Sequence, residues 1–148
     1  MKKIYLLTHN KLIELDKNTG EEICDIKILG FFSSKNKCDE AIKSYLCLPG
    51  FKDYPNRFFI ETIVADINDF NNVEGEFAKF VYYLSHEWYD GEFDYVNHLG
   101  YYSSMEKAEE AKEKYKMQEE FKDDLNGFGI DEYEIDVQEW LEGFFTWK

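Results

Sequence analysis

Arginine, proline and long apolar runs are scarce in this sequence of 148 residues. Arg57 is the single arginine. The sequence contains 17 lysines and arginines and 31 aspartates and glutamates, which gives a formal net charge of −14. Because phosphate contacts require a basic face, the sequence predicts no direct binding to nucleic acid, and charge would attract a basic partner. The apolar runs are only as long as a strand, so neither a membrane span nor a signal peptide is expected.

Cysteine is also rare, and the cysteines show no disulfide or metal pattern. Cys24, Cys38 and Cys47 are odd in number and lack a C-x-x-C spacing. This pattern is typical of a reduced protein and predicts a cytoplasmic location. Aromatic residues make up 18% of the chain and hydrophobic residues 44%, which is too much for a disordered protein.

An internal repeat is the clearest feature that the sequence does contain. The stretch "LGFFSS" at residues 29–34 returns as "LGYYSS" at residues 99–104, and residues 29–67 align with residues 99–137 without a gap. In the numbering of the first copy, the identical positions are Leu29, Gly30, Ser33, Ser34, Lys37, Glu40, Ala41, Tyr45, Phe51, Lys52, Asp53, Asn56, Phe58, Ile60 and Asp66. The chain is therefore interpreted as a duplicated unit.

Each copy predicts two strands, a helix and a third strand. Ser34 and Ser104 stand where a helix N-cap is expected, and residues 60–67 and 130–137 have the composition of a strand. The apolar residues at helical spacing are Cys38, Ala41, Ile42 and Tyr45 in the first copy and Met105, Ala108, Ala111 and Tyr115 in the second. Each helix should therefore bury one face.

The expected fold class is α+β, with two ββαβ repeats at residues 1–70 and 78–148. Antiparallel strands would form one sheet or two, with the helices packed on one face. A lone three-stranded sheet of this size is marginally stable. We therefore expect the two repeats to share one core and to be related by a pseudo-twofold axis.

Three segments carry a resemblance to a known family. The second repeat contains "LGYYSSMEKAEEA" and "FGIDEYEIDVQEWLEGF", and the first contains "LPGFKDYPNRF". They resemble a small bacterial domain family of unknown function, in which a Tyr-Ser-Ser-capped helix precedes a Gly-Phe-x-Asp-Tyr-Pro segment and a strand ending in Trp-x-x-Gly-Phe. The first repeat keeps the middle segment at residues 50–55, and the second keeps the ending at Trp140, Gly143 and Phe144. The resemblance implies tandem copies of the domain and a bacterial origin, but no activity.

Charge is the largest difference between the repeats. Residues 1–70 contain 10 Lys and Arg against 11 Asp and Glu, whereas residues 71–148 contain 7 against 20. In the predicted third strand of the second repeat, a two-residue period places Glu132, Glu134 and Asp136 on one face. The acidic residues of the predicted helix have a simpler interpretation, because a solvated acidic face maintains solubility.

The predicted function is a non-enzymatic acidic module that docks or neutralises a basic protein, as an immunity protein or an inhibitor does. Carboxylates would steer the partner and a neighbouring tryptophan would anchor it. The predicted contact residues are Glu132, Glu134, Asp136, Glu139, Trp140 and Glu142.

Two alternative functions remain open. A self-associating structural module would pair exposed strand edges and could form a homodimer. A small-molecule enzyme would use His9 and His86, which occupy the same position at the end of the first strand of each repeat. Since a metal site needs three or four ligands and no spacing supplies them, neither a metal nor a cofactor is predicted. For both histidines, a structural hydrogen bond at a strand end is the favoured interpretation.

Overall fold

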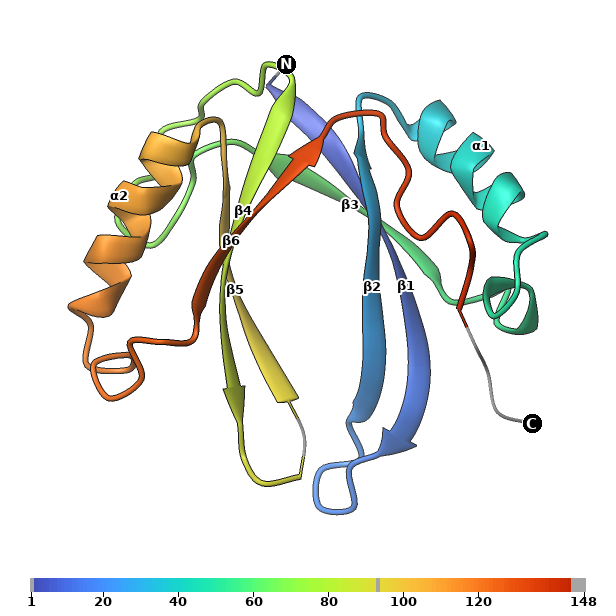
Figure 1. Ribbon diagram of the computed structural model, residues 1–148, viewed down its shortest axis with the longest axis horizontal. Helices are drawn as coiled ribbons and strands as arrows, with labels where there is room; N and C mark the ends of the chain where they lie inside the picture. The colour runs from blue at the N-terminus through green and yellow to red at the C-terminus, as the bar shows by residue number, and fades with distance from the viewer. Residues whose placement is uncertain (1, 93, 145–148) are drawn as a thin grey trace. The chain divides into compact units, whose positions relative to one another are not determined.

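Each half of the chain folds as two strands, a helix and a third strand (Figure 1). The computed structural model describes residues 2–92 and 94–144. The elements are β1 (Lys3–Leu15), β2 (Glu22–Phe32), α1 (Lys35–Tyr45), the 3-10 turn η1 (Phe51–Asp53), β3 (Phe58–Val64), β4 (Phe80–Tyr89), β5 (Asp94–Tyr102), α2 (Met105–Lys116) and β6 (Phe128–Glu134).

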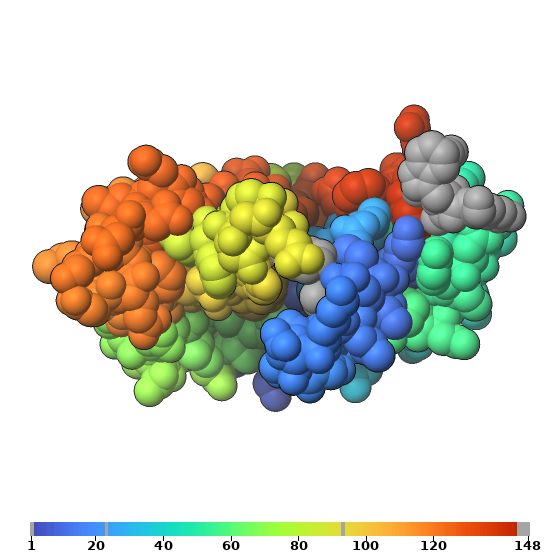
Figure 2. All heavy atoms as spheres, turned by 90° about the horizontal axis from the view of Figure 1, so that it is seen from below, coloured from blue at the N-terminus to red at the C-terminus, as the bar shows by residue number. Residues whose placement is uncertain are grey.

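The strands form two three-stranded antiparallel sheets, with the orders β2-β1-β3 and β5-β4-β6. The predicted α+β class is confirmed. The third strands were expected at residues 60–67 and 130–137, but both begin two residues earlier and end three residues earlier. The hairpin tips, blue near residue 20 and yellow near residue 90 in Figure 2, are exposed.

The helices begin where the sequence predicts. The hydroxyl oxygens of Ser34 and Ser104 accept hydrogen bonds from the backbone N–H groups of Lys37 and Lys107, each at 3.2 Å. The predicted helix stripes are buried, except that Ile42 is only partly buried and Met105 is 41% exposed. The buried residues of the stripes are Cys38, Ala41 and Tyr45 on α1 and Ala108, Ala111 and Tyr115 on α2.

The repeated Leu-Gly pair forms a β-bulge in each sheet. Leu29 is the extra residue where β2 pairs with β1, and Leu99 is the extra residue where β5 pairs with β4. The carbonyl groups of these leucines accept hydrogen bonds from the hydroxyl groups of Tyr45 and Tyr115, each at 3.2 Å. Each bulge thus fixes the helix of its own repeat to the sheet.

The compact units of the protein do not follow the sequence repeats. The first unit combines residues 4–62 with residues from 136 onward, and the second unit contains residues 63–135. We call residues 65–77 the first tail and residues 136–144 the second tail. Each tail therefore packs in the unit that contains the helix of the other repeat, as Figure 1 shows for the red second tail beside α1 and β2.

Each unit contains its own hydrophobic cluster. In the first unit, Phe144 of the second tail packs against buried residues of β1, β2, α1 and η1, including Phe51. In the second unit, the cluster joins β4, β5 and α2 with Phe121. A shared core and a pseudo-twofold relation stay predictions.

The N-cap interaction predicts a defined loss of stability. Replacing Ser34 by alanine should lower the free energy of unfolding by about 1 kcal/mol, because the N–H group of Lys37 loses its acceptor. Urea unfolding followed by circular dichroism measures the change. Ser44→Ala, at an exposed site inside α1, is the control and should leave stability nearly unchanged. Equal losses in both variants would contradict the capping role.

Candidate functional site

The second tail lies along the outer edge of β2. The backbone N–H of Asp136 donates to the carbonyl of Phe31 at 2.7 Å, and the N–H of Glu139 donates to the carbonyl of Leu29 at 2.8 Å. β2 is an edge strand of its sheet, so these bonds use carbonyl groups that no neighbouring strand covers. The tail therefore covers part of the edge of β2.

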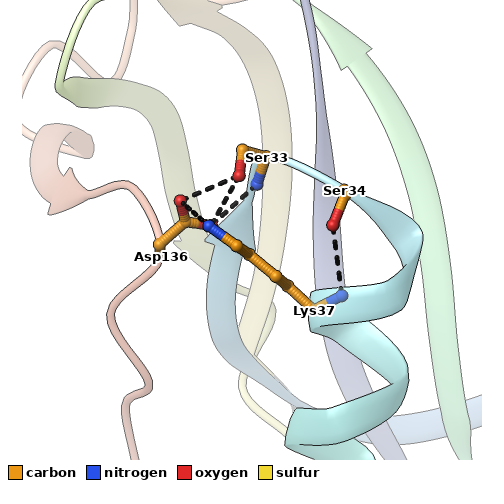
Figure 3. Close-up of polar contacts among 4 residues, drawn as sticks. All are labelled: Ser33, Ser34, Lys37 and Asp136. Carbon is orange, nitrogen blue, oxygen red and sulfur yellow. Dashed lines mark hydrogen bonds and ion pairs between the residues drawn. The ribbon is translucent and has the colours of Figure 1, made fainter.

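The carboxylate of Asp136 anchors the tail to the start of α1 (Figure 3). It accepts hydrogen bonds from the backbone N–H of Ser33 at 2.8 Å, from the Ser33 hydroxyl at 2.8 and 3.1 Å, and from the Lys37 ammonium at 2.9 Å. Partial burial alone would raise the pKa of Asp136, but the bonds from Ser33 and Lys37 outweigh it and lower that pKa. The charged carboxylate is therefore the form that the fold stabilises.

The same arrangement occurs in the second unit with Asp66 of the first tail. Its carboxylate accepts hydrogen bonds from the Ser103 N–H at 2.9 Å, the Ser103 hydroxyl at 2.8 Å and the Lys107 ammonium at 3.1 Å. Asp66 and Asp136 both have a φ of 68°. We call each set of Asp, Ser and Lys an aspartate latch. Its three residue types are identical in the two repeats and make the same contacts in both units.

The predicted row of carboxylates is wrong at Asp136. β6 ends at Glu134, and the left-handed backbone of Asp136 turns its side chain onto Ser33 and Lys37 instead of continuing the two-residue period. Glu132 and Glu134 lie exposed on β6, and Glu134 pairs with Lys79 at 3.4 Å. Two of the predicted contact residues thus lie on β6, and the other four lie on the second tail.

Trp140 lies on the second tail with one ring face over a buried lysine. The Lys27 ammonium is 5.2 Å from the Trp140 ring centroid and 4.2 Å from that of Phe144. Lys27 is only 6% exposed and pairs with Asp25, whereas Trp140 is 46% exposed. Glu142 is exposed as well. Trp140 is therefore both a packing residue and a surface residue.

Two of the segments that carry the family resemblance meet in the first unit: the one that contains Pro49 and Phe51, and the one that ends at Phe144. The backbone N–H of Phe144 donates to the carbonyl of Pro49 at 2.9 Å, and the rings of Phe144 and Phe51 lie edge to face at 4.8 Å. This contact joins the Pro-Gly-Phe part of the first repeat to the Trp-x-x-Gly-Phe ending of the second. The presence of each part in only one repeat was the signal in the sequence that could have predicted the contact.

Both histidines are buried among aromatic rings within their own unit. His9 donates through Nε2 to the carbonyl of Tyr54 at 3.0 Å, and burial lowers its pKa. His86 donates through Nε2 to the carbonyl of Asp124 at 2.9 Å and packs against Phe121. These contacts support a structural role for the two histidines. The predicted position at a strand end is wrong, because His9 lies inside β1 and His86 lies inside β4.

Four acidic residues of α2 and the following turn are paired with neighbouring lysines. The pairs are Glu109 with Lys112, Glu110 with Lys114, Glu113 with Lys116 and Glu119 with Lys122, at 2.6 to 3.6 Å. Exposed pairs of this kind contribute little stability. They support the interpretation of this block as a solvated face.

A cavity of about 190 Å³ lies in the second unit between the first tail and α2. Its lining mixes acidic, basic and amide side chains, including the latch residues Asp66 and Lys107. None of the predicted contact residues lines it. Among residues 2–92 and 94–144, no cluster of His, Cys, Asp and Glu side chains could hold a metal ion, and no helix is long and apolar enough to cross a bilayer.

Comparison with known proteins gives one match. The sequence model of a domain family of unknown function, DUF7336, matches residues 79–144. This range contains β4, β5, α2, β6 and the second tail. No curated protein and no solved structure matches the chain.

The latch predicts how stability depends on pH. Asp136→Asn should lower the free energy of unfolding by about 1–3 kcal/mol near neutral pH, because charge-assisted hydrogen bonds are lost while asparagine tolerates the backbone. The pKa of Asp136 is below its ordinary value of 3.8 in the folded protein, so its contribution is complete above that pH and falls as the pH drops below it.

Urea unfolding at neutral pH and at about pH 3 measures this contribution. The difference between wild type and Asp136→Asn should shrink at the lower pH. Glu132→Gln, at an exposed site on β6, should match wild type at both. A constant difference at the two pH values would contradict the charged latch.

The contact between the second tail and Gly50 predicts a steric effect. Gly50 has a φ of 84°, and a Cβ there would lie 2.4 Å from the carbonyl oxygen of Phe144. Gly50→Ala should therefore destabilise the first unit by about 2–4 kcal/mol, the sum of backbone strain and displaced packing. Gly20→Ala has the same strain at a φ of 76° but meets no atom within 4 Å, so it should cost only about 1 kcal/mol. Similar melting temperatures for both variants would exclude tight docking of the tail.

Proposed function

We propose that the protein is a non-enzymatic acidic module that docks a basic partner protein, of the immunity-protein or inhibitor type, through the outer surface of the second tail. The observation that carries the proposal is the composition of that surface. Val137, Trp140 and Leu141 are 41%, 46% and 63% exposed, and Glu142 lies beside them. An exposed aromatic anchor with acidic neighbours is the composition of a protein interface.

The distribution of charge supports the same surface. Lysines compensate four of the acidic residues of α2 and the following turn, as described above. Among the described residues, Glu139 and Glu142 of the second tail form no ion pair. Carboxylates without a cation nearby retain their attraction for a basic partner, which accelerates association. Asp136 holds the tail in place, so it is not one of the proposed contact residues.

The tails make strand-edge self-association less favourable. The second tail uses the carbonyl groups of Leu29 and Phe31 on β2, and the N–H of Asp66 in the first tail donates to the carbonyl of Tyr101 on β5 at 2.8 Å. While the tails are docked, these carbonyl groups are not free to pair with an edge strand of another chain. The binding role is thus favoured over a module that assembles through these edges.

The two repeats are best explained as tandem copies of one bacterial domain that acts in the cytoplasm. The match to residues 79–144 covers the second copy. The first copy has the same order of elements, the same bulge and the same aspartate latch. These shared features support descent of residues 1–70 from the same domain.

A pull-down with matched variants tests the proposed function. The tagged protein is incubated with lysate of its source organism, captured proteins are identified by mass spectrometry, and the affinity of the purified pair is measured by calorimetry at low and high salt. We expect a basic protein whose binding weakens at high salt. Trp140→Ala should weaken it by about 30-fold or more, and Glu139→Gln with Glu142→Gln should reduce the salt dependence.

The control variant carries Glu109→Gln and Glu113→Gln, which remove the same number of charges from α2. It should bind within about twofold of wild type, because Glu109 and Glu113 are already paired with lysines and do not belong to the proposed surface. Capture of no basic protein, or equal loss of affinity in the tail and control variants, would refute the proposed surface.

A further inference from the structure

The socket that receives the second tail is built only from residues of the first repeat. It presents the carbonyl groups of Leu29 and Phe31, the latch residues Ser33 and Lys37, and the carbonyl of Pro49. Every one of these groups contacts the tail. These contacts of the socket are therefore contacts to the tail itself.

The second tail is joined to its own sheet at a single point. β6 ends at Glu134, Ile135 still donates its N–H to the carbonyl of Lys79 in the second unit, and Asp136 already belongs to the latch in the first unit. The first tail, by contrast, is held between β3 and β4, so its displacement would move a whole sheet. The second tail is thus the element that can change its partner with the least rearrangement.

We propose that the second tail of one chain docks in the first-repeat socket of a second chain, and the reverse, which gives a closed tail-exchanged dimer. The contacts are the same in the monomer and in the dimer, because the socket and the tail bring the same residues to both. Exchange of an identical element is a low-cost route to a dimer. The partner is a second copy of this chain, and the surface that carries Trp140 is retained in both forms.

Concentration decides which form is populated. Docking within one chain benefits from an effective concentration in the millimolar range, so the monomer should dominate at micromolar protein. Dimers should form when unfolded chains refold together at about millimolar concentration. They should persist on dilution, because release of a tail breaks the aspartate latch and the packing of Phe144 on Phe51.

A pair of charge-reversal variants tests the exchange. Lys37→Glu places two carboxylates in the latch, and Asp136→Lys places two ammonium groups there. In a mixed dimer, both latches are matched: Asp136 of the first variant meets Lys37 of the second, and the two reversed residues meet each other. The backbone strain of a lysine at position 136 is the same in monomer and dimer and cancels from the comparison.

The two variants are refolded separately and together, and light scattering and native mass spectrometry measure their assembly. The mixture should form heterodimers at least about tenfold more tightly than either variant forms homodimers, the effect of restoring charge-assisted hydrogen bonds. The double variant Lys37→Glu with Asp136→Lys restores the latch within one chain and should be monomeric. A mixture without heterodimers, or equal dimers in all samples, would overturn the proposal.

A second measurement applies if a single variant does not fold. Tagged and untagged wild-type chains are refolded together at about millimolar concentration and then diluted. Mixed dimers that survive dilution support the exchange. Mixed dimers that dissociate within minutes indicate association through the surface. The absence of mixed dimers shows that the tail docks only within its own chain. Either result refutes the proposal.

Discussion

An aspartate with a left-handed backbone, bound by a serine and a lysine at the start of a helix, is the interaction on which the rest of this structure depends. The left-handed conformation ends the third strand, and the bonds to Ser33 and Lys37 direct the chain onto the edge of β2. Three consequences follow from this one turn. The tail covers a strand edge, closes the hydrophobic cluster with Phe144, and brings Trp140 to the surface of the other repeat.

The two latches are alike, but the contacts beyond them differ. In the second unit, Gly75 approaches Asp66 so closely that a Cβ would lie 1.9 Å from a carboxylate oxygen, and the first tail turns back on itself. In the first unit, the tail continues to Pro49, whose carbonyl group accepts a hydrogen bond from the N–H of Phe144. The latch attaches both tails in the same way, and the residues that follow the latch determine what each tail contacts.

The sequence predicted those features that depend on neighbouring residues. The N-caps at Ser34 and Ser104, most of the buried helix stripes and the order of helices and strands along the chain follow from local spacing, and the structure has them. The course of the chain after β6 was predicted wrongly, because an alternating pattern of acidic residues through Asp136 gives no sign that the strand has ended. The identity of Ser33, Lys37 and Asp66 with their second-repeat equivalents was visible, but identity alone does not show that the Asp of one repeat binds the Ser and Lys of the other.

The position of Trp140 shows how the same interaction can serve both stability and binding. Lys27 is almost fully buried, and a buried ammonium needs compensation, which Asp25 and the rings of Trp140 and Phe144 provide. This contact fixes one face of the indole and leaves nearly half of the side chain accessible. A partner that packs on the accessible part meets an anchor whose rotamer is already ordered, so less conformational entropy is lost on binding. A structural role for Trp140 and its proposed role as an anchor therefore reinforce each other.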